Sequence, residues 1–201
     1  MQTVLLLLSF LRLSTCLPLP TLYASFLHSQ GLSPTSLTLG RSLSDTDYLL
    51  GGSLSSAFLL SLSGDAVHWY LTYPPYSQVV DCSTKLLCLF KTPSNQGHLM
   101  QLEPHTGQPV SGFLIEELGT QVKVAFMENG GAIIGWVKEG RLMVTRVEDG
   151  KMLWGRTIGW KSQRNMLTEI AIAADKVVVA GMVVLGQGKG WDRGGMVKID
   201  A

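Results

Sequence analysis

Three glycines spaced at a regular interval constrain the fold more than any other feature of the sequence. Gly64, Gly107 and Gly150 are 43 residues apart in both intervals. A partly polar, strand-like run precedes each glycine, and a segment with an aromatic residue follows it. Glycine suits such turns because it adopts positive φ without a steric penalty. Self-similarity at a fixed period indicates that the chain is built from copies of one supersecondary unit.

Each unit contains four short segments with the composition of β-strands. Continuous apolar runs begin at Tyr48, Leu86, Ala132 and Lys176. Continuous rather than alternating apolar runs are typical of strands buried on both faces. We therefore expect four units of four strands, over about residues 20–63, 66–103, 108–147 and 151–201. In this division the strand after each turn glycine begins the next unit.

Units of this length predict a β-propeller. A four-stranded unit of ~40–45 residues matches one propeller blade. One such sheet cannot bury both of its faces alone, whereas sheets stacked radially cover each other. The predicted fold class is therefore all-β and β-propeller-like, with about four four-stranded antiparallel blades. Such a set of blades closes on itself, is completed by a second copy in a homodimer, or is an incomplete ring.

Sequence motifs within the units resemble those of a known group of propellers. Residues 99–103 (LMQLE), followed by Thr106 and Gly107, are similar to an acidic turn motif that ends in Thr-Gly. Residues 58–62 and 196–200 are similar to the strand that precedes that turn. The chain resembles the β-propeller repeat proteins of the quinoprotein-like and bacterial propeller-repeat kinds. It departs from their pattern at Ser111, which stands where a tryptophan is expected.

The N-terminal segment indicates where the protein is located, and the overall charge argues against one class of partner. Residues 1–17 are predicted to be a signal peptide, because an apolar run over residues 4–11 precedes small residues. Residues 18–201 then form the propeller domain of a secreted or extracytoplasmic protein. The apolar run is too short for a membrane span, which needs ~20 residues. The net charge of +1 argues against nucleic acid as a partner.

Two cysteines flank a predicted hairpin turn. Cys82 and Cys88 lie on either side of the sequence STKLL. Pairing of the two strands brings their side chains within reach of a disulfide. Buried free thiols are the alternative, because cysteine often packs as a small apolar residue. Their spacing does not match a zinc-binding pattern.

An extended loop in the fourth unit is the predicted binding site. The segment 182–194 is longer than its counterpart in the third unit. The candidate binding residues in this loop are Lys189, Trp191, Asp192 and Arg193. Long loops on rigid scaffolds often carry function, and tryptophan and arginine are frequent anchors at interfaces. The alternative is an insertion whose tryptophan packs on its own blade.

Aromatic residues recur after the turn glycines, at Trp69, Phe113 and Trp154. They either pack blade against blade or line a channel, and the first interpretation is favoured because repeated aromatics are typical of blades. The four histidines lack the spacing of metal ligands and are interpreted as structural or surface residues.

The sequence predicts a non-enzymatic binding module that presents loops to a protein or glycan partner, without a cofactor. The resemblance implies an alternative, a fragment of a quinoprotein-like dehydrogenase that uses pyrroloquinoline quinone and calcium. A third interpretation is an incomplete propeller that has no function of its own.

Overall fold

The computed structural model describes residues 36–64, 66–158, 164–172, 177–185 and 192–200. All regular elements in these residues are β-strands, arranged as four antiparallel sheets that we call blades 1 to 4. Blade 1 contains β1 (Ser36–Ser42), β2 (Asp47–Ser53), β3 (Ala57–Ser63) and β4 (Ala66–Tyr73). Blade 2 contains β5 (Gln78–Cys82), β6 (Leu87–Lys91), β7 (Gly97–Leu102) and β8 (Pro109–Ile115).

Blade 3 contains β9 (Thr120–Phe126), β10 (Ala132–Lys138), β11 (Arg141–Glu148) and β12 (Lys151–Ile158). Blade 4 contains β13 (Arg164–Ile172), β14 (Val177–Leu185) and β15 (Asp192–Asp200). Within each blade the strands lie side by side in chain order. The predicted all-β, propeller-like fold is confirmed, with three four-stranded blades and three described strands in the fourth.

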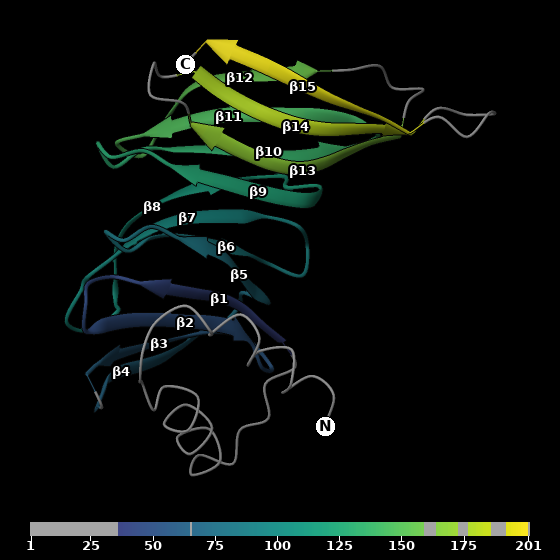
Figure 1. Ribbon diagram of the computed structural model, residues 1–201. Coiled ribbons are helices and arrows are strands. Elements are labelled where there is room, and N and C mark those ends of the chain that lie inside the picture. The colour runs from purple at the N-terminus through teal and green to yellow at the C-terminus, as the bar shows by residue number, and fades with distance from the viewer. Residues whose placement is uncertain (1–35, 65, 159–163, 173–176, 186–191, 201) are drawn as a thin grey trace.

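The blades stack face to face along the chain (Figure 1). The first strand of each blade contacts the first strand of the next, through β1 with β5, β5 with β9, and β9 with β13. These are the inner strands, and β4, β8 and β12 are the outer ones. Blades 1 and 4 lie at opposite ends of the described stack, which is open rather than closed into a ring (Figure 1). Completion of the ring by a second copy stays a prediction.

The predicted division of the repeat was wrong by one strand. The strand after each turn glycine pairs with the strand before it, as Ser63 with Ala66 and Glu148 with Lys151 show. The φ angles at Gly64, Gly107 and Gly150 are +56°, +71° and +67°. A tight turn of this kind reverses the chain and joins neighbours by hydrogen bonds. The crossing from one blade to the next therefore comes after β4 and β8.

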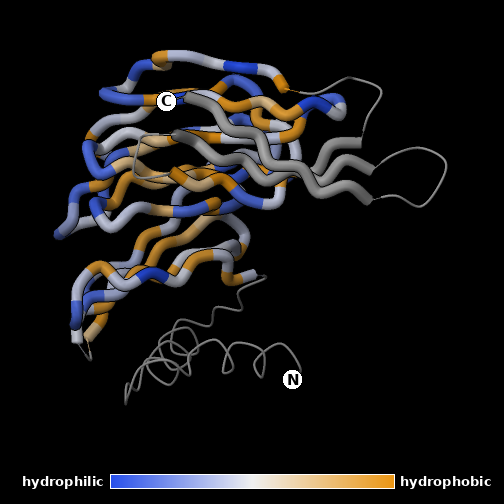
Figure 2. Tube along the Cα trace, turned by 45° about the horizontal axis from the view of Figure 1, so that its top comes forward, coloured by the Kyte–Doolittle hydropathy of each residue, from blue (hydrophilic) through white to orange (hydrophobic). Residues whose placement is uncertain are grey.

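The core lies between the blades. One cluster joins blades 1 and 2, and it includes Leu49, Leu59, Phe90 and Met100. Further clusters join blade 2 to blade 3 and blade 3 to blade 4. The apolar segments run along the strands inside the stack, whereas hydrophilic segments occupy many of the turns (Figure 2). Each inner face is thus buried by its neighbour, as expected for stacked sheets.

In the described part of the chain, we find no helix with the length and apolarity that a membrane crossing requires. Residues 1–17, the predicted signal peptide, lie outside the residues that the structure describes.

Candidate functional site between blades 2 and 3

The predicted binding loop falls mostly outside the described residues. Lys189 and Trp191 belong to that undescribed part. Asp192 and Arg193 begin β15, where their backbones pair with Leu185 and Val184 of β14. The assignment of this loop as a binding site therefore stays a prediction.

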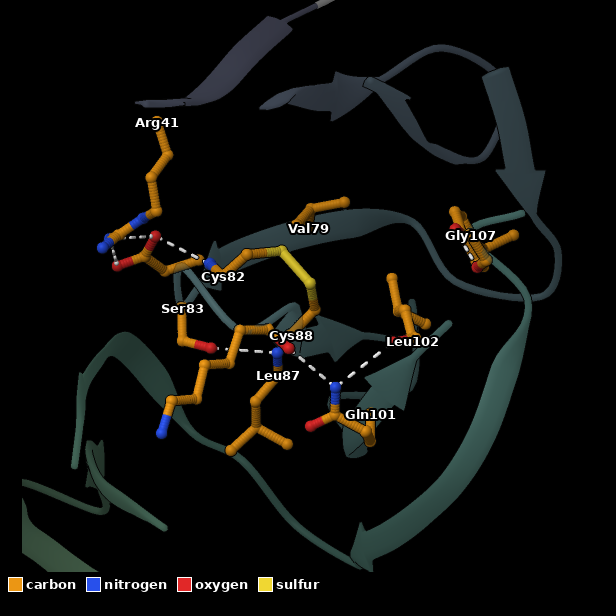
Figure 3. The surroundings of a disulfide bond; sticks show 12 residues. Arg41, Val79, Cys82, Ser83, Leu87, Cys88, Gln101, Leu102 and Gly107 are labelled. Carbon is orange, nitrogen blue, oxygen red and sulfur yellow. Dashed lines mark hydrogen bonds and ion pairs between the residues drawn. A yellow bond between two sulfur atoms is a disulfide. The ribbon is translucent and has the colours of Figure 1, made fainter. Parts of the chain in front are cut away.

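Cys82 and Cys88 form a disulfide across the β5–β6 hairpin (Figure 3). The two residues are directly paired in the sheet, and their Cα atoms lie 4.0 Å apart. Both side chains are fully buried in the cluster between blades 1 and 2. The structure therefore has a disulfide here, and not the buried free thiols that the sequence left open as the alternative.

An ion pair beside the disulfide links the inner strands of blades 1 and 2. The Arg41 guanidinium donates to both carboxylate oxygens of Asp81, at 2.9 and 3.0 Å (Figure 3). The same carboxylate accepts a hydrogen bond from the backbone N–H of Cys82 at 2.7 Å. This arrangement holds the two inner strands in register and is structural.

Trp69 on outer strand β4 packs against the β7–β8 turn of blade 2. Its indole N–H donates to the carbonyl oxygen of Pro104 at 2.8 Å. A Cβ atom placed on Gly107 would lie 2.8 Å from two carbons of the indole ring, so the ring rests directly on the glycine backbone. The Tyr73 hydroxyl donates to the Gly107 carbonyl oxygen at 2.8 Å. Trp69 therefore packs blade against blade and lines no channel.

The turn under Trp69 is held by its own hydrogen bonds. The Glu103 carboxylate accepts from the Thr106 backbone N–H at 2.6 Å and from its hydroxyl at 2.7 Å. These hydrogen bonds lower the pKa of the Glu103 carboxyl, and the bond from the Thr106 hydroxyl has the largest effect. The Gly107 N–H donates to the Glu103 carbonyl oxygen at 2.8 Å. The turn is a preformed platform for the indole.

The equivalent position in blade 2 is Ser111. Trp69 pairs with Ser61 of β3, and Ser111 pairs with Gln101 of β7. In both blades a shift of strand register follows this pair directly. Trp154 occupies the same place in blade 3, opposite Arg146. Blade 2 thus has a small polar side chain where its neighbours each have an indole.

The short side chain of Ser111 leaves a hollow between blades 2 and 3, which we call the 2–3 hollow. Its volume is about 210 Å³, far more than one ordered water requires. Blade 2 contributes Leu87, Leu99, Gln101, Ser111, Gly112 and Phe113. Blade 3 contributes Gly130, Val147, Glu148, Asp149 and Gly150.

The 2–3 hollow has an apolar floor and a polar, exposed rim. Leu99 and Val147 are buried beneath it, whereas Ser111, Gly112 and Asp149 are exposed. A Cβ atom on Gly150 would have no heavy atom within 4 Å, in contrast to the crowded Gly107. Glu148 is held by Asn129 at 2.5 Å and by Arg146 at 2.6 Å. The wall on the blade 3 side is therefore fixed in place.

The chemistry of the lining residues suits binding rather than catalysis. Ser111 supplies the one side-chain hydroxyl among them, and no histidine or cysteine accompanies it. The carboxylates of Glu148 and Asp149 also line the hollow, but among the described residues neither is hydrogen-bonded to the Ser111 hydroxyl, and a hydroxyl that no base activates is a weak nucleophile. In the sequence, Ser111 was noted only as a departure from the repeat. That departure was the signal for the hollow. A hollow forms there only because of how blade 3 packs beside blade 2.

Three histidines lie near the blade 1–2 junction. The rings of His68 and His105 are 5.9 Å apart, and both residues are exposed. His98 Nδ1 forms a hydrogen bond with the Tyr76 hydroxyl, and burial lowers the pKa of its imidazole. Within the described ranges, no group of three or more His, Cys, Asp or Glu residues is placed to hold a metal ion. The dehydrogenase alternative thus gains no ligand residues from this part of the chain.

Stacked antiparallel meanders, with aromatic side chains of outer strands packed on the following blade, define a β-propeller-like repeat protein. The resemblance to propeller repeat proteins is confirmed at the level of the fold. No known family model matches the chain, and no curated protein matches its sequence.

Among solved structures, the chain is similar to the crystal structure of BamB from Moraxella catarrhalis. The identity is 15% and the TM-score 0.48, and the match covers 78% of this chain and 51% of that one. The chain therefore spans about half the length of that structure. A likeness of this degree carries no argument about function, which has to come from the residues themselves.

Proposed function

We propose that the chain is a non-catalytic β-propeller module that binds another protein at the 2–3 hollow. The observation that carries the proposal is Ser111 at the position where the neighbouring blades have a tryptophan, beside a hollow that has an apolar floor and a polar rim and is open to solvent. Rigid blades surround it on both sides, so a bound group would meet a preformed site. Preorganisation of this kind lowers the cost of binding.

The composition of the 2–3 hollow favours a protein over a glycan. Its floor is apolar, with Leu87, Leu99 and Val147 buried, and its rim is polar. An apolar centre with a polar rim is the usual anatomy of a protein–protein anchor site. A glycan site requires several convergent polar side chains that are free to bind. Of the four polar side chains in the lining, Gln101 and Glu148 are already hydrogen-bonded within the chain, which leaves Ser111 and Asp149.

We propose that this module works in an oxidising, extracytoplasmic compartment. The support is the disulfide between Cys82 and Cys88, because such bridges persist mainly in secreted and extracellular proteins. The predicted signal peptide over residues 1–17 agrees with this location. The net charge of +1 keeps nucleic acid outside the proposed partners.

The experiment that tests this function is selection of peptides from a displayed library on the purified protein. The selected peptides are then measured on two variants. Ser111→Trp fills the hollow, and Val110→Trp places the same ring on the neighbouring residue, which is 67% exposed and does not line the hollow. We expect peptides that bind the wild type and Val110→Trp equally and lose at least tenfold in affinity on Ser111→Trp. Selection of no peptide with this dependence would contradict the proposal.

A further inference from the structure

We infer that the group taken up by the 2–3 hollow is the indole ring of a tryptophan on the partner protein. This inference rests on the proposed function and specifies its ligand. The molecule contains an equivalent junction between two other blades in which this position is occupied by a side chain; we call it the filled version. The filled version shows which side chain the geometry accepts.

The filled version is the junction of blades 1 and 2. There Trp69 is only 8% exposed, and its ring lies flat on Gly107 of the following blade. Its N–H donates to a backbone carbonyl, that of Pro104, at 2.8 Å. The apolar ring is thus buried, and its single polar N–H is hydrogen-bonded, as a buried tryptophan requires.

The empty version is the junction of blades 2 and 3. Ser111 stands at the register position of Trp69, opposite the last residue before the register shift in the preceding strand. The next blade again presents a glycine with positive φ, Gly150 at +67°. No heavy atom lies within 4 Å of a Cβ atom built on Gly150. The turn glycine is therefore present and uncovered, on a shorter turn than the one that carries Gly107, and the ring that covers Gly107 in the preceding junction has no counterpart here.

The walls of the 2–3 hollow match the two parts of an indole. Three glycines, Gly112, Gly130 and Gly150, leave backbone surface on which a flat ring can lie. Leu99 and Val147 supply the apolar contact beneath it. Asp149 at the exposed rim offers carboxylate oxygens to an N–H donor, and the neighbouring acidic residue Glu148 disfavours an anionic ligand.

Phenylalanine would fill the apolar part of the hollow but would leave the acceptor on the rim unused. A tryptophan side chain uses both, and tryptophan is among the residue types enriched in the hot spots near the centres of protein interfaces. We therefore expect a tryptophan rather than a phenylalanine in the hollow.

The test uses a small probe that isolates the side chain, N-acetyl-tryptophanamide, with N-acetyl-phenylalaninamide as its comparison. Binding to the full purified protein is followed by ligand-observed NMR. We expect saturable binding of the tryptophan probe, with a Kd on the order of millimolar for a ligand of this size. We expect at least fivefold weaker binding of the phenylalanine probe.

Variants assign that binding to the hollow. Ser111→Trp should abolish it, Ser111→Leu should weaken it at least threefold, and Val110→Trp should leave it unchanged, with folding of each checked by its circular dichroism melting curve. Saturable binding that persists undiminished in both Ser111 variants would overturn the inference. Absence of saturable binding to the wild type would also overturn it.

The failure of this inference and that of the proposed function give different results. If library peptides bind through the hollow but carry no tryptophan, the function stands and the indole assignment is wrong. If no peptide depends on the hollow, the proposed function itself fails.

Discussion

Trp69 and Gly107 meet across the junction of blades 1 and 2, with indole carbons 2.8 Å from the position of a Cβ atom on the glycine. Gly107 is thus required twice, once for its φ of +71° and once for the close approach of the ring. Gly150 shares the first requirement, with φ of +67°, and lacks the second. A comparison of the two glycines therefore separates the cost of backbone strain, which both positions share, from the cost of inter-blade packing, which only Gly107 has.

This difference predicts the effect of two matched alanine variants. Gly150→Ala should cost about 1–2 kcal/mol in the free energy of unfolding, from strain at positive φ alone. Gly107→Ala should cost a further ~1–3 kcal/mol, because the new methyl group displaces Trp69. Urea denaturation of both variants measures the difference. Equal costs would show that Trp69 does not press on Gly107.

Filling the 2–3 hollow should stabilise the protein. Ser111→Trp is expected to raise the free energy of unfolding by about 1 kcal/mol, as cavity-filling substitutions commonly do. The melting temperature should then rise by about 2–4 °C for a chain of this length. Thermal melting followed by circular dichroism checks this, with Val110→Trp as the control that adds the same ring outside the hollow. A lower melting temperature for Ser111→Trp than for the control would argue that the site does not accept an indole.

Removal of the Cys82–Cys88 disulfide should destabilise the protein by about 2 kcal/mol, since the bridge closes a short loop. The change is Cys82→Ala with Cys88→Ala, and the measurement is the urea midpoint with and without reductant. The wild type should lose stability on reduction, whereas the double variant should not respond. A double variant that still responds to reductant would show that the bridge is not the origin of the effect.

Stability should fall as the pH is lowered through the range just below 6.5. Burial lowers the pKa of His98 in the folded protein below its ordinary value of 6.5. The unfolded chain therefore takes up a proton first, and the free energy of unfolding decreases until the pH falls below the folded-state pKa. His98→Gln should flatten this dependence in urea titrations at pH 7.5 and 5.5.

The control for the pH dependence is Tyr76→Phe. It keeps the aromatic ring that packs on the His98 imidazole at 5.1 Å and removes only the hydroxyl. Because burial causes the pKa shift, this variant should retain the slope of stability against pH. An unchanged slope in His98→Gln would assign the effect to another group.

The repeat and the strands were predictable because they depend on local chemistry. Turn glycines such as Gly64 need positive φ, and the apolar run after Ala132 has the composition of a central strand, so the sequence alone indicates both. The assignment of the strand that carries Trp69 to the next unit was wrong. The period of a repeat does not reveal where one sheet ends, and the tight hairpin at Gly64 decides it.

The candidate site was less accessible to sequence reasoning. Ser111 was recognised as a departure from the repeat, yet a serine on an outer strand reads as a surface residue until the next blade is placed beside it. The hollow exists because Gly150 and Val147 of blade 3 face the vacant position of blade 2. That relationship is tertiary, and no spacing in the sequence encodes it. The loop with Lys189 and Arg193 stays a prediction.

The most direct test of the account is to map the binding site by amide NMR with a library-selected peptide. The account predicts that the largest chemical-shift changes fall on the amides of Gly112, Gly130 and Gly150, which line the hollow between blades 2 and 3. It also predicts that these changes disappear in Ser111→Trp. Changes confined to the loop over residues 186–193, with the three glycines unaffected, would contradict the account and place the binding surface on the loop.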